Sequence, residues 1–198
     1  MKLDKAHIAQ LAAQHKGLLK AADLTASGLS FKQIRQLVAS GDLEKLGQGL
    51  YRAGAHPYDE RSEIARRIPA GVFCLYSACF LHQLSDFVPS EQHLAVPKKS
   101  RYVLPEYPPV KLYYWETVPF QLGIADFPLP DASTIRVYDP EKTVCDVLRL
   151  REKAGLDIVK EVVKNYLQRP TRDIAKLHDY ARQLRVEKAL THFLDVLL

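Results

Sequence analysis

The 198-residue sequence has few of the features that mark secreted, membrane-spanning or disulfide-rich proteins. Its three cysteines are too few for a disulfide framework in a chain of this size. No apolar run approaches the roughly 20 residues that a membrane-spanning helix needs. The charged start, residues 1–5, is not followed by the apolar segment of a signal peptide. We therefore expect a cytoplasmic protein that does not bind a membrane.

The sequence also lacks the common motifs of enzymes and metal sites. It has no Walker-type glycine-rich loop, no GxSxG elbow, no HExxH pair and no Glu-x-Lys of the nuclease type. Four residues separate Cys74 from Cys79, and no second Cys or His pair follows at zinc-finger spacing. His82 lies three residues after Cys79, but two ligands do not hold a structural metal. We predict no catalytic residues, no metal and no cofactor.

One group of carboxylates, Asp139, Glu141 and Asp146, could suggest catalysis. A simpler interpretation fits the first two, because they stand at the start of a predicted helix. Asp139 suits the N-cap, Pro140 suits the first helical position, and Glu141 complements the helix dipole. These acids are therefore expected to be structural.

Charge is distributed unevenly along the chain. The formal net charge is +5, and residues 1–56 carry eight Lys or Arg against four Asp or Glu. Residues 57–198 carry twenty against nineteen. The basic excess in the first quarter would attract phosphate, although an ordinary solvated basic surface explains it equally well.

The N-terminal quarter has the pattern of three short helices followed by a β-hairpin. Apolar spacing predicts helices over residues 3–14, 18–24 and 30–40. Residues 43–53 then show two short apolar–polar alternations that meet at a glycine-rich turn. This order is typical of a winged helix-turn-helix, and we predict such a DNA-binding domain over residues 1–56.

The third helix is the strongest candidate for a functional site. It begins with a capping box, Ser30 and Gln33, and we expect Phe31, Ile34 and Leu37 to be buried on one stripe. In a helix-turn-helix, the exposed N-terminal half of this helix reads bases in the major groove. The predicted base-reading residues are Lys32, Gln33, Arg35 and Gln36. The residues predicted to contact DNA from the wing are Lys45, Gln48 and Arg52.

The rest of the chain, residues 57–198, is predicted to form a second domain of the α+β class. Residues 60–68 and 73–84 suggest helices, and four strand-like runs separated by proline-rich turns occupy residues 93–138, including 120–124. From Asp139 onward the pattern is helical, with helices expected over 139–155, 156–167, 173–184 and 186–197. A basic series in this part is expected mainly as a solvated face: Lys142, Arg149, Arg151, Lys153, Lys160, Lys164, Arg169 and Arg172.

Three stretches resemble the AbiEi-type antitoxins of the AbiE (type IV) toxin–antitoxin systems. They are LGQGLYR at 46–52, YSACFLHQL at 76–84 with the strand HLAVP at 93–97, and DPEKTVCD at 139–146. Gln83 stands where the family usually has glycine, and Lys142 where arginine is more common. The resemblance implies an N-terminal DNA-binding domain that represses its own operon. It also implies a C-terminal domain that counteracts a nucleotidyltransferase-like toxin.

The main hypothesis is a two-domain antitoxin and transcriptional autorepressor. Its expected partners are double-stranded DNA of its own promoter, with inverted repeats, and a cognate nucleotidyltransferase-like toxin. The alternative is a stand-alone winged-helix regulator whose C-terminal domain dimerises or senses a ligand. A third class, an enzyme built on the α+β domain, would require a deep polar pocket with clustered acids.

Overall fold

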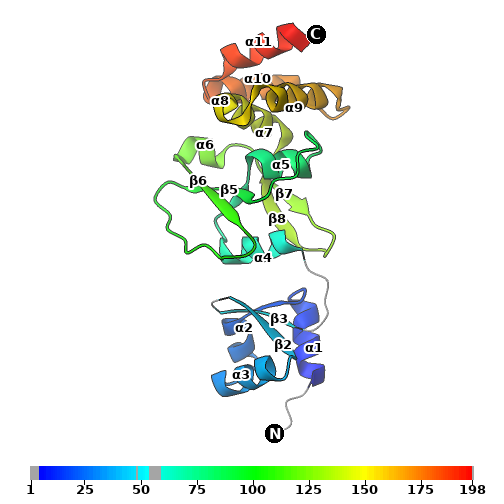
Figure 1. Cartoon of the computed structure of the whole chain (residues 1–198), viewed down its shortest axis with the longest axis vertical. Coiled ribbons are helices and arrows are strands. Elements are labelled where there is room, and N and C mark those ends of the chain that lie inside the picture. Colours follow the sequence, from blue (N-terminus) through cyan, green and yellow to red (C-terminus); the bar gives the residue numbers. More distant parts are fainter. Residues whose placement is uncertain (1–4, 48, 54–58, 198) are drawn as a thin grey trace. The chain divides into compact units, whose positions relative to one another are not determined.

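The computed structural model describes residues 5–47, 49–53 and 59–197 (Figure 1). The chain divides into two compact units, residues 1–66 with 128–134 and residues 67–127 with 135–198. Helices hold 49% of the residues and strands 20%, which confirms the predicted α+β class. None of the helices in the described part of the chain has both the length and the apolar character to cross a membrane. The predicted domain boundary at residues 56/57 stays a prediction.

The first unit contains a winged helix-turn-helix. Its elements are α1 (Lys5–Gln14), β1 (Leu18–Lys20), α2 (Ala21–Ala26), α3 (Phe31–Ala39), β2 (Leu43–Gly47) and β3 (Leu50–Ala53), followed by α4 (Glu60–Arg67). The three strands pair antiparallel in the order β1-β3-β2. This arrangement confirms the predicted third helix and hairpin. The start of the predicted first helix, and Gln48 of the predicted turn, lie outside the described residues.

The predicted second helix, residues 18–24, is wrong at its start. Residues 18–20 form strand β1, and the helix covers Ala21–Ala26 instead. Leu18 and Leu19 are both buried, and β1 pairs with β3, which lies at least 30 residues further along the chain. A short apolar run fits either a strand or a buried helix, so its spacing alone does not reveal the pairing.

The core of the winged helix forms where these elements meet. Its buried members are Ile8, Ala12, Leu19, Leu24, Ile34, Leu37, Leu43 and Ala53. At full burial each large aliphatic side chain contributes about 1.5–3 kcal/mol of stability relative to the exposed state. The core thereby fixes one face of α3 inside and leaves the opposite face to solvent.

The second unit is built on a five-stranded mixed sheet in the order β6-β5-β4-β8-β7. The strands are β4 (Val72–Phe73), β5 (Gln92–Pro97), β6 (Val110–Trp115), β7 (Ile124–Pro128) and β8 (Thr134–Tyr138). Strand β5 runs antiparallel to β4 and parallel to β6, and β4 runs parallel to β8.

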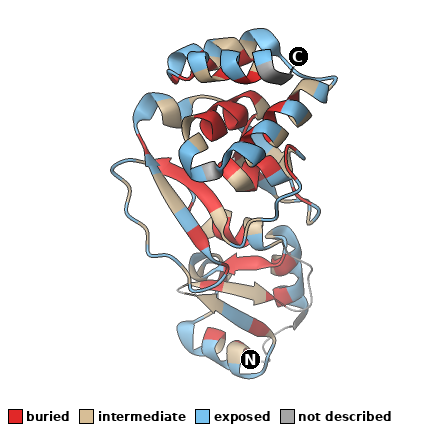
Figure 2. Cartoon of the chain, turned by 45° about the horizontal axis from the view of Figure 1, so that its top comes forward, coloured by how far each residue is buried: buried red, intermediate tan, exposed pale blue. Residues whose placement is uncertain are grey.

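Helices cover this sheet and form the C-terminal part of the unit. They are α5 (Leu75–Leu81), α6 (Thr117–Gln121), α7 (Pro140–Arg149), α8 (Arg151–Ala154), α9 (Leu156–Gln168), α10 (Ile174–Gln183) and α11 (Glu187–Leu197). Figure 1 shows α7 to α11 gathered at one end of the sheet. Buried residues follow the inner strands and the inner sides of these helices (Figure 2).

Three predictions in this unit are wrong. The predicted helix over 139–155 is divided at Leu150 into α7 and α8. The predicted helix over 73–84 is shorter, because Phe73 belongs to strand β4 and the helix spans Leu75–Leu81. The predicted strand over 120–124 is replaced by helix α6 and the start of β7. Pro119 lies in the first turn of α6, where the missing backbone N–H removes no helical hydrogen bond. The helices predicted over 156–167, 173–184 and 186–197 are confirmed as α9, α10 and α11.

Candidate nucleic-acid interface

Local capping positions helix α3 as the sequence predicts. The backbone N–H of Gln33 donates to the Ser30 hydroxyl at 3.3 Å, and the backbone N–H of Ser30 donates to Gln33 Oε1 at 2.8 Å. Gly41, at a φ of +78°, follows the other end of the helix. Ile34 and Leu37 are each only 1% exposed, so they anchor α3 in the core.

The structure brings three of the four predicted base-reading residues onto one open face. Lys32, Arg35 and Gln36 are exposed on α3. Gln33 lies apart from them, half-buried, because its side-chain oxygen accepts hydrogen bonds from both the backbone N–H and the hydroxyl of Ser30. A guanidinium, an ammonium and a free amide on the same helix face can bind guanine, phosphate and adenine.

The predicted burial of Phe31 is wrong, because its side chain is 65% exposed. Phe31 is the first residue of α3 and lies beyond the edge of the core. Leu29, one residue before the cap, packs against the core instead. Leu29 and Ile34 occupy the two positions of a hydrophobic staple, which is the sequence signal that would have placed Phe31 outside.

The wing presents fewer open cations than predicted. Lys45 is exposed on β2, directly opposite Tyr51 of β3. Arg52 is half-buried and forms an ion pair with Glu44, its cross-strand neighbour. Gln48 lies outside the described residues.

One exposed cation beside the wing was missed by the sequence analysis. Lys20 ends β1 and pairs in register with Leu50, the first residue of β3. The next residue, Ala21, donates its backbone N–H to the carbonyl of Gly49 at 2.8 Å. Only the β1–β3 pairing brings Lys20 to this place, and the predicted helix over 18–24 concealed it.

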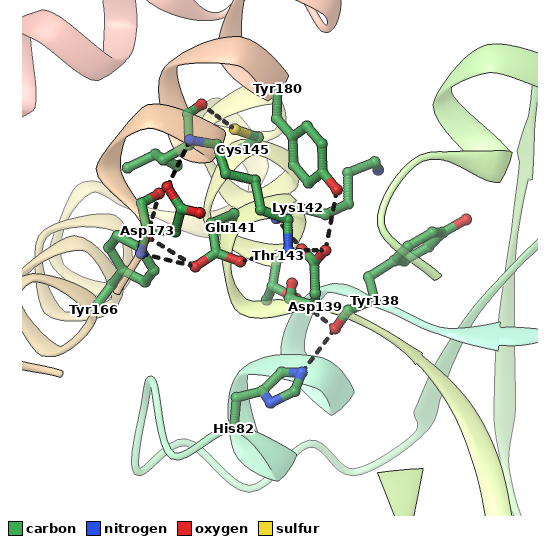
Figure 3. A network of polar contacts seen from close by, with 12 residues as sticks. His82, Tyr138, Asp139, Glu141, Lys142, Thr143, Cys145, Tyr166, Asp173 and Tyr180 are labelled. Atoms are coloured by element: carbon green, nitrogen blue, oxygen red, sulfur yellow. Dashed lines mark hydrogen bonds and ion pairs between the residues drawn. The ribbon is translucent and has the colours of Figure 1, made fainter. Parts of the chain in front are cut away.

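The second unit contains a buried polar network that includes Lys142 of the predicted basic series (Figure 3). Lys142 is 0% exposed, and its Nζ donates to both carboxylate oxygens of Asp146 at 2.6 Å. The same ammonium lies 4.2 Å from the ring centroid of Trp115 and 4.3 Å from that of Tyr138. Burial lowers the pKa of Lys142 and raises that of Asp146, while the attraction between the two opposes both shifts.

The predicted solvated face of the C-terminal basic series is therefore wrong for Lys142. Arg149 is half-buried with its guanidinium 5.1 Å from the ring centroid of Trp115. Arg169 is also half-buried and donates to the carbonyl of His82 at 2.5 Å. The exposed members are Lys153, Lys160, Lys164 and Arg172.

The carboxylates at the start of α7 have structural partners. Asp139 accepts the backbone N–H of Lys142 at 2.8 Å, which confirms its predicted role as the N-cap. Lys176 of α10 bridges Asp139 at 2.9 Å and Glu141 at 3.2 Å. Glu141 also accepts the hydroxyl of Tyr166 at 2.9 Å (Figure 3). These acids join α7 to α9 and α10.

A cavity of about 280 Å³ lies within the second unit, between α5, β5, β6, α7 and α8. Its lining residues are Leu75, Tyr76, His93, Lys111, Tyr113, Val147, Leu150 and Lys153, and none of them is a carboxylate. His93 Nδ1 lies 3.0 Å from the Tyr113 hydroxyl, and burial lowers the pKa of His93 to about 4. The imidazole is therefore neutral at physiological pH, and this cavity does not offer the clustered acids that an enzyme of the third class would need.

The described residues also contain no group of three or more His, Cys, Asp or Glu side chains that could hold a metal ion. Cys74, Cys79 and Cys145 are free, buried thiols, as small apolar side chains in a core would be.

A winged helix with exposed Lys, Arg and Gln side chains is typical of DNA-binding regulators, and the comparison with known families supports this class. The profile of the family "Transcriptional regulator, AbiEi antitoxin" matches residues 8–54, which span α1 to β3. The resemblance seen in the sequence is thus confirmed for the N-terminal region. No curated protein matches the chain.

The fold of nearly the whole chain is similar to that of a protein of known structure. The known structure is that of the RV2827C protein from Mycobacterium tuberculosis, with a TM-score of 0.55 and 18% sequence identity. The match covers 96% of this chain and 78% of that one. At this identity the likeness concerns the fold alone.

Proposed function

We propose that this protein represses its own operon by inserting α3 into the major groove of promoter DNA. The observation that carries the proposal is the open polar face of a capped and core-anchored helix in a winged helix-turn-helix. Residues 1–56 have a net charge of +4, which favours approach to the phosphate backbone. The family match over residues 8–54 supports the same function.

The exposed residues of α3 have separate roles in this proposal. Arg35 reads guanine through two hydrogen bonds, Gln36 reads adenine, and Lys32 contacts guanine or a phosphate. From the wing, Lys45 contacts the DNA backbone, together with Gln48 and Arg52. Gln33 maintains the cap of α3 and contacts DNA through its amide nitrogen. Two copies of the chain bind inverted repeats in the promoter.

The test measures binding of the full chain to its own promoter and to random DNA of equal length. We expect tighter binding to the promoter and an affinity that falls steeply as salt rises, because each neutralised phosphate releases counterions. A triple variant, Lys32→Ala/Arg35→Ala/Gln36→Ala, removes the preference for the promoter. The matched control, Lys160→Ala/Lys164→Ala/Arg172→Ala, alters exposed cations of the second unit and retains that preference. Equal binding of the wild type to both DNAs would refute base recognition.

We further propose that the second unit counteracts a cognate nucleotidyltransferase-like toxin. The support is the resemblance of residues 76–84, 93–97 and 139–146 to AbiEi-type antitoxins, together with a hydrophobic core that belongs to this unit alone. In cells carrying toxin and promoter reporter, the α3 triple variant should lose repression and still protect against the toxin. Loss of protection together with repression would mean that the chain acts only as a regulator.

The cavity beside His93 favours a second candidate, a ligand-responsive regulator without antitoxin activity. Lys153 supplies positive charge at the lining, whereas the ammonium of Lys111 is paired with Glu91 at 3.0 Å. Tyr76 and Tyr113 supply aromatic surface, so the cavity suits a small organic anion that Lys153 can bind. Repression without any protection, combined with a shift of the His93 NMR signals on adding benzoate as a probe, would favour this candidate over the antitoxin.

A further inference from the structure

Phe31 lies outside the core, and its exposed side chain is accessible to a partner. Of the large apolar side chains in residues 5–47 and 49–53, it alone is exposed. It opens the first turn of α3, beside Lys32 and four residues before Arg35. Side chains four residues apart on a helix lie on the same side, so Phe31 and Arg35 face the same way.

Neither the fold nor the cap requires a phenyl ring at this position. Ser30 and Gln33 complete the capping box, and Leu29 and Ile34 occupy the staple positions. The ring therefore exposes apolar surface to water on a face whose other members are cationic or polar. Such a face fits a polyanion that carries an isolated apolar group within reach of the helix end.

Double-stranded DNA has such a group. In the major groove, the C5-methyl of thymine is the apolar feature that distinguishes one base pair from the others. We propose that Phe31 reads a thymine methyl group close to the guanine that Arg35 reads. This inference rests on the proposed insertion of α3 into the major groove, and it adds an apolar contact to the hydrogen bonds of that site.

The helix geometry limits where this thymine lies in the operator. Four residues of α-helix rise about 6 Å, and successive base pairs are about 3.4 Å apart. The thymine should therefore lie within about two base pairs of the guanine recognised by Arg35. A phenyl ring cannot replace the hydrogen bonds that water makes with the exocyclic amino group of cytosine or adenine, so those bases are disfavoured at this position.

The test removes the methyl group without changing base pairing. Each thymine in the protected region of the promoter is replaced in turn by deoxyuridine, and binding of the full chain is measured. For the wild type, one position in each half-site should weaken binding about four-fold, which corresponds to the loss of one buried methyl contact. Phe31→Ala should bind the thymine operator about as weakly and should lose sensitivity to the methyl group at that position. Phe31→Leu, which keeps an apolar side chain, should retain part of the sensitivity to the methyl group.

Two controls separate this effect from misfolding and from general changes in hydrophobicity. Phe31→Ala should unfold at nearly the same denaturant concentration as the wild type, because the ring is exposed. Val103→Ala removes a side chain that is 92% exposed in the second unit, and it should leave the thymine effect unchanged.

The outcomes distinguish the inference from the proposed function. A wild type that does not prefer its promoter would overturn the DNA-reading function, and the inference with it. Promoter binding that is insensitive to every thymine methyl, or an equal methyl effect in wild type and Phe31→Ala, would overturn the role of Phe31 alone.

Discussion

Lys32 and Lys142 show how differently the two units use the same side chain. Lys32 is exposed on α3, next to Phe31 and on the same helix as Arg35. Lys142 is fully enclosed by Asp146, Trp115 and Tyr138. In the first unit, the basic side chains of α3 are accessible to a partner. In the second unit, the side chain of Lys142 is buried and bound within the core. The number of charged residues in the sequence cannot distinguish Lys32 from Lys142, because the two differ only in the side chains that surround them in the fold.

The largest effect on stability is expected from removing one partner of the buried Lys142–Asp146 ion pair. Lys142→Ala leaves the Asp146 carboxylate buried without its cation, and loss of one partner of a buried ion pair lowers stability by about 3–5 kcal/mol. Denaturant unfolding of the full chain measures this change. Lys142→Met/Asp146→Leu removes both charges and should recover most of the loss. The exposed matched control, Lys32→Ala, should alter stability by less than about 0.5 kcal/mol. Equal stability of Lys142→Ala and Lys32→Ala would show that the buried Lys142 does not stabilise the second unit.

The next largest effect is a pH dependence of stability, and it is caused by His93 of the second unit. Burial lowers the pKa of His93 from 6.5 to about 4, with Glu91 opposing the shift and Lys111 adding to it. Burial also raises the pKa of Asp146 to about 6, which contributes in the opposite sense. Between about pH 4 and 6.5, the His93 imidazole binds more protons in the unfolded chain than in the folded chain, so the His93 contribution to stability should fall as the pH is lowered through this range. The shift corresponds to at most about 3 kcal/mol.

This pH dependence is measured by denaturant unfolding at several pH values. His93→Gln should remove that part of the slope, while His192→Gln, at an exposed position on α11, should retain it. An unchanged slope in His93→Gln would assign the acid sensitivity to other groups.

Capping motifs in the sequence correctly predicted where two helices begin. Ser30 and Gln33 located the start of α3, and Asp139 with Pro140 located the start of α7. These motifs act through backbone atoms within three or four residues, so one short segment contains all the information needed.

The errors arose where distant segments decide the outcome. Residues 18–20 form a strand only because β3 offers its edge, and Lys142 is buried only because Trp115 and Tyr138 enclose it. For the candidate site, the sequence correctly indicated that Lys32, Arg35 and Gln36 are exposed on α3. It misplaced Phe31, which is exposed, and Gln33, which is half-buried. It also had no signal for Lys20, whose place beside the wing depends on strand pairing.

In the winged helix, a smaller effect should separate base reading from charge. Arg35→Ala should weaken discrimination at one base position by about 1–3 kcal/mol, because a bidentate contact to guanine is lost. Competition binding with operators that differ only at that base pair measures it. Stability should be unchanged, in contrast to Lys142→Ala. If Arg35→Ala weakens binding to promoter and random DNA by the same factor, α3 does not read bases through this residue.

The smallest effect is expected at the wing. Lys45 is exposed on β2, and its strand neighbour Glu44 is paired with Arg52, so Lys45 remains available to a phosphate. Lys45→Ala should weaken binding to all DNA sequences about equally and should reduce the slope of log affinity against log salt by about 1. Salt titrations on promoter and random DNA measure both quantities. Lys98→Ala, an exposed lysine of the second unit that is paired with Glu116, serves as the control and should leave the slope unchanged. A Lys45→Ala effect confined to the promoter would mean that the wing contributes to sequence recognition, and base reading would then extend beyond α3.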